Sequence, residues 1–229
     1  MKRRFIKILK NNMFLLHVVS IMYNVVHLSL RIRFLFKNRI ISKGVFLKNT
    51  KFWIKGTANL IIIHPESRLS SCLFHINGNN CKILIGKHCV LLKSEFWIED
   101  DFSTISLGGF TTIEGAHIAA TEGKSIIIGE DCMLAQSIQI RNGDSHPIYE
   151  QRTDRLLNAA KDVHLGNHVW LGYGVTILKG CSIGDNSIIG SGSVVTSNVE
   201  PDSIYVGSPA KKVKDSIYWK RHREYSRVN

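Results

Sequence analysis

Near the end of the chain, aliphatic residues recur at every sixth position over more than thirty residues. The rungs of this ladder are Leu165, Leu171, Ile177, Ile183, Ile189 and Val195, and glycine follows four of them. The position two before each rung is small or apolar: Val163, Val169, Val175, Cys181, Ser187 and Ser193. No ordinary helix or hairpin keeps this period over such a length. A fixed internal period indicates one unit stacked on copies of itself, so the ladder predicts a solenoid.

Each six-residue unit is predicted to be a short strand followed by a corner. Because strand side chains alternate in direction, the rung and the residue two before it share one side, which we place inside. Glycine after the rung relieves the backbone at the corner. Three units close a triangular coil, and stacked coils bury an aliphatic column. The period recurs less cleanly upstream, at Ile85 and Leu91, Leu107 and Ile113, and Ile128, Leu134 and Ile140.

Positive charge is concentrated at the two ends of the chain. The 229 residues carry a formal net charge of +12, yet residues 66–210 hold 10 basic and 16 acidic residues. Residues 1–65 hold 13 basic and no acidic residues, without a motif that reads a nucleic-acid groove, so nucleic acid is not an expected partner. We expect a basic amphipathic helical segment over 1–43, a repeat domain over 44–206 with a loop over 141–162, and a basic C-terminal tail or helix over 207–229.

Residues 11–30 contain no charged side chain, although basic residues flank them. A polar stripe at helical spacing predicts an amphipathic helix, and it consists of His17, Ser20, Asn24, His27 and Arg31. Such a helix packs on the body, lies on an anionic membrane or spans it, and the sequence leaves these alternatives open. No small-x-small cleavage site follows the apolar run, which argues against a signal peptide.

The five cysteines are odd in number and form no CxxC pair. Three of them, Cys89, Cys132 and Cys181, lie two residues before an aliphatic rung, where a small apolar side chain is needed. This pattern predicts buried thiols in a reducing compartment. The expected location is the cytoplasm, with peripheral contact to the inner face of the membrane if the N-terminal helix binds there.

The ladder is interrupted between Ile140 and Leu165, which are 25 residues apart, or four sixes plus one. The polar insertion therefore leaves the stack as a loop, a frequent location for function. It contains His146, which precedes a proline and follows Asp144 by two residues. A neutral imidazole can remove a hydroxyl proton near neutral pH. We predict His146 as a general base and Asp144 as the group that orients its ring, although Asn142-Gly143-Asp144 is also typical of a simple turn.

The repeat of an aliphatic residue followed by glycine resembles that of the hexapeptide-repeat acyltransferases. The resemblance spans roughly residues 75–214 and implies a left-handed parallel β-helix, a handedness that the period itself does not give. The segments IRNGDSHPIY and GNHVWLG are most similar to bacterial O-acetyltransferases of capsular or sialic-acid-containing glycans. This similarity implies acetyl transfer from acetyl-coenzyme A to a glycan hydroxyl, by a homotrimer with active sites between subunits and without a metal.

The resemblance also assigns individual residues. The family's loop histidine corresponds to His146, and its tryptophan beside the thioester corresponds to Trp170, although Trp170 could instead only shield a corner of the stack. Simple sugar acetyltransferases carry an asparagine about two coils before the histidine. Glu114 lies near that place here, so it is the candidate for binding the acceptor hydroxyl, and the departure puts the acceptor's identity in doubt.

Donor contacts in related sugar acetyltransferases fall on repeat positions and on basic residues after a G-x-P turn. The matching positions here are Tyr173, Ser191, Thr196, Lys211 and Lys214, with Lys212 as a substitute. A lysine can meet nucleotide phosphates as a mobile point charge, although a solvated basic tail would look the same in sequence.

Three other functions remain open at this point. N-acetylation of an amino-sugar nucleotide would use the same scaffold. A metal hydrase would need three converging histidines, for which His117, His164 and His168 offer only a loose set. A non-catalytic or membrane-tethered scaffold fits the basic ends but has no need of the ejected loop.

Overall fold

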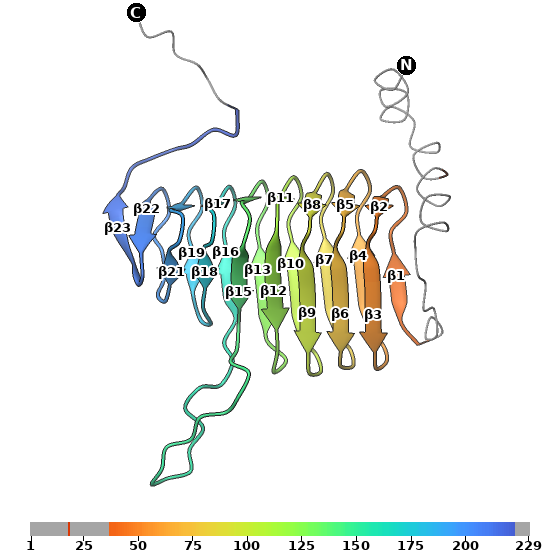
Figure 1. The fold of residues 1–229 in the computed structure, drawn as a ribbon, viewed down its shortest axis with the longest axis horizontal. Helices are drawn as coiled ribbons and strands as arrows, with labels where there is room; N and C mark the ends of the chain where they lie inside the picture. Colours follow the sequence, from red (N-terminus) through yellow and green to blue (C-terminus); the bar gives the residue numbers. More distant parts are fainter. Residues whose placement is uncertain (1–17, 19–36, 223–229) are drawn as a thin grey trace, which may run out of the picture.

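The chain forms a three-sided stack of short parallel strands (Figure 1). The computed structural model describes Val18 and residues 37–222. Three sheets run along the stack, one on each side, and the chain visits them in turn, so from β1 to β21 each strand pairs with a strand three places away in sequence. The solenoid that the six-residue period predicts is therefore confirmed.

The three sheets are named A, B and C in the order in which the chain enters them. Sheet A contains β1 (Arg39–Ile41), β4 (Leu60–Ile63), β7 (Lys82–Ile85), β10 (Thr104–Leu107), β13 (Ser125–Ile128), β16 (Val163–Leu165) and β19 (Ser182–Ile183). Sheet B contains β2 (Phe46–Lys48), β5 (Arg68–Ser70), β8 (Val90–Leu92), β11 (Thr112–Ile113), β14 (Met133–Leu134), β17 (Trp170–Leu171), β20 (Ile188–Ile189), β22 (Ile204–Gly207) and β23 (Ala210–Lys214). Sheet C contains β3 (Lys51–Lys55), β6 (Leu73–Asn77), β9 (Glu95–Glu99), β12 (Ala116–Ala120), β15 (Ile138–Arg141), β18 (Thr176–Ile177) and β21 (Val194–Val195).

Coils shorten along the stack. Hydrogen-bonded neighbours such as Thr57 and Asn79 are 22 residues apart in the early coils, whereas Asn167 and Asp185 are 18 apart in the late ones. Eighteen residues are three hexapeptides, so the six-residue period is exact only where the coils contain nothing else. The longer upstream coils have five-residue strands in sheet C, which explains why the repeat is harder to see there.

The core is a continuous column of inward side chains. All six rungs and all six residues two before them are buried, so the predicted inward face of the ladder is confirmed. In the early coils the column becomes aromatic: the ring centroids of Phe52 and Phe74 lie 5.0 Å apart, and those of Phe74 and Phe96 lie 4.9 Å apart. Each coil therefore packs on the coil before and the coil after it.

The five cysteines belong to this column. All of them are buried free thiols, as the sequence predicted. Burial raises the pKa of Cys72, Cys89 and Cys132 to about 11, so these thiols stay protonated and act as small apolar side chains.

Glycine is required at some corners because consecutive coils approach closely. A Cβ atom on Gly108 would lie 2.5 Å from the backbone nitrogen of Glu130 in the next coil. Any side chain at this position would push the two coils apart.

The edges of the stack extend past the expected domain boundaries. β1 already pairs with β4, although residues before 44 were assigned to the N-terminal segment. At the other end β23 pairs antiparallel with β22, and the segment after it continues in irregular structure up to residue 222. The amphipathic helix expected in residues 11–30 lies outside the described residues. Within the described part, no helix has the length and apolarity to cross a bilayer.

We expect Phe74→Ala to lower the free energy of unfolding by about 3–5 kcal/mol, because it removes a ring packed between two others. Denaturant unfolding followed by circular dichroism measures the change. Phe102→Ala is the matched control, since that ring is 65% exposed. Equal midpoints for the two variants would contradict the aromatic column.

Candidate active site

A long loop leaves the stack where β15 ends and returns at β16, below the body in Figure 1. Ser125 and Asp162, which lie on neighbouring coils, are 37 residues apart, so this coil contains far more chain than any other. The loop folds on itself as a hairpin-like arm, with an antiparallel bridge between Tyr149 and Leu156. The ejected loop predicted over 141–162 is thus present.

A polar clamp closes the base of the arm. The Asp144 carboxylate accepts hydrogen bonds from Lys179 Nζ at 2.5 Å and from Asn158 Nδ2 at 2.8 Å. Asn158 also donates to the His146 carbonyl at 2.8 Å and accepts from the Ile148 amide at 2.7 Å. The hydrogen bond from the Lys179 ammonium, and to a smaller extent that from the Asn158 amide, holds the pKa of the Asp144 carboxyl below its usual range. Asp144 therefore stays ionised and ties the arm to the next coil.

His146 lies on the arm with its side chain exposed, at the edge of a hollow of about 740 Å³. The arm forms one wall of the hollow, and the ends of sheet C strands form the other, through Trp97, His117 and Arg141. In the described part of the chain, no hydrogen bond joins Asp144 to the His146 ring. The clamp instead fixes the His146 backbone, through Asn158.

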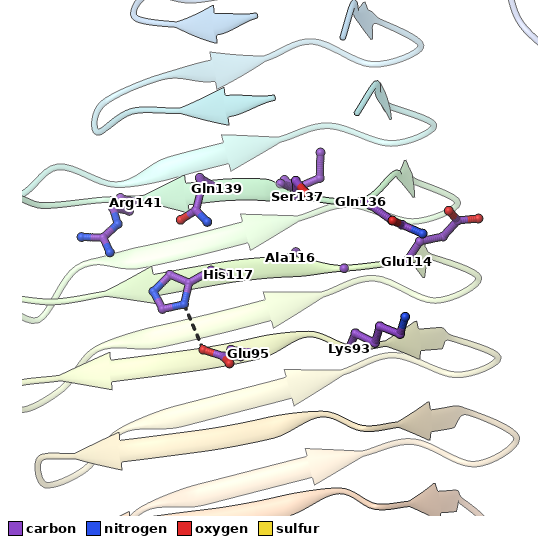
Figure 2. A pocket seen from close by; sticks show the side chains of 11 residues that line it. Lys93, Glu95, Glu114, Ala116, His117, Gln136, Ser137, Gln139 and Arg141 are labelled. Atoms are coloured by element: carbon purple, nitrogen blue, oxygen red, sulfur yellow. Dashed lines mark hydrogen bonds and ion pairs between the residues drawn. The ribbon is translucent and has the colours of Figure 1, made fainter. Parts of the chain in front are cut away.

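A second hollow, of about 490 Å³, adjoins the first on the outer face of sheet C. Figure 2 shows Glu114 and Gln136 at one end of it, and His117, Gln139 and Arg141 toward the other. His117 and Arg141 line both hollows, so the two are continuous. The structure thus brings His146 and Glu114 to one face, at opposite ends of a shared groove.

Trp170 lies elsewhere in the same subunit. It is on β17 in sheet B, near the upper edge of the stack in Figure 1, whereas the arm leaves from the lower edge. The indole is 37% exposed and lies beside Trp219, at 5.8 Å between ring centroids. Trp170 and His146 therefore do not meet within one chain.

The C-terminal segment runs back along the corner that precedes sheet B. The Trp219 ring stacks on His168 at 3.8 Å, and its Nε1 donates to the His168 carbonyl at 2.9 Å. Farther along, Arg221 binds the Asp131 carboxylate and donates to the Cys132 carbonyl at 2.6 Å. Sequence reasoning missed this contact, which supports the edge of the stack beneath Trp170.

The predicted donor residues fall into two places. Tyr173 and Ser191 lie on stacked corners between sheets B and C, where the Gly192 amide donates to the Tyr173 carbonyl at 2.7 Å. A hydrogen bond of 3.0 Å from the Gly207 amide to Ser193 Oγ places the β22–β23 turn beside this corner. Lys211 and Lys214 are exposed on β23.

Two further donor candidates are placed differently. Thr196 follows β21, on the edge that carries the arm. Lys212 donates to Glu200 at 2.8 Å, a contact that raises the pKa of the lysine, so its charge is already paired.

Two of the three histidines considered for a metal have other partners. His168 Nδ1 lies 2.6 Å from Asp131, and His117 Nδ1 lies 3.3 Å from Glu95. Among the described residues, no group of three or more His, Cys, Asp or Glu side chains is arranged to hold a metal ion.

Comparison with known proteins identifies the class. The family model for bacterial transferase hexapeptide (six repeats) matches residues 162–197. A polysialic acid O-acetyltransferase of Neisseria meningitidis is 37% identical over 147 residues, covering 55% of this chain and 68% of that protein. A protein of the same name from Escherichia coli O1:K1 is 33% identical over 119 residues, covering 52% of this chain and 39% of that protein. The crystal structure of the polysialic acid O-acetyltransferase OatWY matches with a TM-score of 0.80 and 35% identity, over 83% of this chain and 91% of that chain.

A three-sided parallel stack with a histidine-bearing arm defines a hexapeptide-repeat acyltransferase, and the matches agree with it. The chain belongs to this family, in the branch that includes the polysialic acid O-acetyltransferases. It is an acetyltransferase with the left-handed parallel β-helix that the sequence resemblance implied.

We expect Lys179→Met to raise the pKa of the Asp144 carboxyl toward its ordinary range and to loosen the arm. Hydrogen exchange at the Ile148 and Leu157 amides should quicken about fivefold, which corresponds to roughly 1 kcal/mol for a partly exposed contact. The wild-type clamp needs an ionised carboxylate, so it is lost only as the pH falls through the lowered pKa. Lys124→Met, at an exposed lysine on the same edge, is the control. Unchanged exchange in Lys179→Met would contradict the clamp.

Proposed function

We propose that this protein transfers an acetyl group from acetyl-coenzyme A to a hydroxyl of a bacterial surface glycan, of the capsular or sialic-acid-containing kind. One observation carries the proposal: an exposed histidine is held by a clamped arm at the edge of a groove made of two continuous hollows. The named substrate of the Neisseria and Escherichia relatives, polysialic acid, supports this class of acceptor.

His146 acts as the general base. Its imidazole takes the proton of the acceptor hydroxyl as the oxygen attacks the thioester carbonyl carbon, and backbone amides stabilise the developing oxyanion. When the carbon–sulfur bond breaks, the imidazolium returns this proton to the departing thiolate of coenzyme A. Asp144 serves as a positioning residue, since it holds the arm through Lys179 and Asn158. Glu114, at the far end of the groove, binds acceptor hydroxyls.

The site is completed by a second subunit. Trp170 and His146 lie on different edges of one stack, so both can face one thioester only if neighbouring subunits contribute them. A homotrimer, the arrangement implied by the family, repeats such a junction three times. Trp170 of one subunit would then line the thioester beside His146 of the next.

The donor lies along the corner that carries Tyr173 and Ser191, with Thr196 contributing from the other edge. This corner fits a narrow acyl arm, because a Cβ atom placed on Gly192 would meet no atom of the described residues within 4 Å. Lys211 and Lys214 on the adjacent hairpin supply positive charge for the phosphates of the nucleotide.

The protein acts in the cytoplasm. There the basic segment 1–43 can hold it at the anionic inner surface of the membrane. N-acetylation of an amino-sugar nucleotide remains the second candidate, because the same base and donor corner would serve an amine acceptor.

We expect His146→Ala to reduce turnover about 10²- to 10⁴-fold, because it removes the base and leaves the stack intact. The measurement is release of free coenzyme A thiol in the presence of a sialylated polysaccharide, with mass spectrometry of the product. His64→Ala, an exposed histidine on another edge, is the control and should behave as wild type. Wild-type turnover by His146→Ala would contradict the assignment. An acetyl product that survives mild base would indicate an amide rather than an ester.

A further inference from the structure

A column of aromatic side chains runs along the outer face of sheet C. Trp53, His75, Trp97 and His117 come from the consecutive strands β3, β6, β9 and β12. Their ring centroids are separated by 6.3, 3.9 and 5.9 Å in this order. The core already has its own aromatic column, so these rings do not serve interior packing.

The column is open at one end and fixed in the middle. Trp53 is 54% exposed, although tryptophan is costly to leave in water. Trp97 Nε1 donates to Glu95 Oε2 at 3.3 Å, and this oxygen lies 3.3 Å from His117 Nδ1, so one carboxylate holds both rings. Burial between the two tryptophans lowers the pKa of His75, so this ring is neutral at neutral pH. Its Nδ1 is buried and has no hydrogen-bond partner among the residues that the structure describes.

Hollows follow the column without a break. A third hollow, of about 580 Å³, includes Trp53 and shares Lys93 and Glu95 with the groove of Figure 2. That groove in turn shares His117 and Arg141 with the hollow at His146. A continuous depression therefore runs across successive coils from Trp53 to the predicted base.

We propose that this depression is a binding track for the acceptor polysaccharide, which holds several sugar residues behind the one being acetylated. The proposal rests on the glycan acceptor of the proposed function. Flat rings stack on the apolar faces of sugars, and these rings come from neighbouring strands that lie about 4.8 Å apart. Lys51, Lys93 and Arg141 can pair with carboxylates of an acidic glycan, while Glu95 and Gln139 can bind hydroxyls.

A second copy of the chain is a less suitable occupant. The centre of a permanent subunit interface is depleted of charged residues. Here lysine, arginine and glutamate side chains line the hollows beside the rings.

The test compares acceptor lengths. Wild-type protein should bind long unacetylated polysialic acid more tightly than short sialic acid oligomers by calorimetry, without coenzyme A, and should show a lower KM for the long polymer. Trp53→Ala should weaken binding of the long polymer about three- to tenfold and so reduce this length dependence. Tyr218→Ala is the control, because that ring is 76% exposed on the opposite edge, and it should keep the wild-type dependence.

Three results would overturn the track: equal binding of both lengths by wild-type protein, failure of the long polymer to bind, or an unchanged length dependence in Trp53→Ala. A change of oligomeric mass in Trp53→Ala, seen by light scattering, would assign the face to a subunit contact and also overturn it. A different result would contradict the proposed function and leave the track standing: the polymer binds along the track, but no acetyl ester forms that depends on His146.

Discussion

Hydrogen bonding between successive coils is the constraint on which this molecule depends. Each strand donates to and accepts from the same strand of the neighbouring coils, and its inward side chains rest on theirs. This pairing restricts which residues can stand inside the stack. A Cβ atom on Gly108 would collide with the next coil, and all six buried rungs are aliphatic. Variation is permitted only at the corners and on the outer faces.

Function follows from this restriction. Chain that cannot enter the stack must leave at a corner, and the segment from Asn142 to Lys161 does so as an arm. An arm without contacts to the stack would not hold His146 in one place. The Asp144–Lys179 ion pair ties the arm to the following coil. The outer face of sheet C then supplies a regular surface beside it. The rigid repeat thus fixes the distance between an exposed histidine and a row of side chains that can bind sugar.

The sequence predicted the parts that follow the six-residue period. The core residues follow from the positions where the six-residue ladder is regular. The position of the arm, with the histidine that it carries, follows from the place where the ladder is interrupted. Trp53, His75 and Trp97 were missed because they repeat every 22 residues, a coil length that only the structure reveals. Lys179 was missed as well, because its contact with Asp144 joins two coils across 35 residues. The contact of Trp219 with His168 was equally invisible, since the tail turns back along the stack.

The central claim is that the acceptor lies on the outer face of sheet C with one hydroxyl at His146. A crystal structure with coenzyme A and an unacetylated sialic acid oligomer tests it most directly. The account predicts sugar rings over β9 and β12, with a hydroxyl oxygen about 3 Å from a His146 ring nitrogen. An oligomer bound along sheet B, far from the arm, would contradict it.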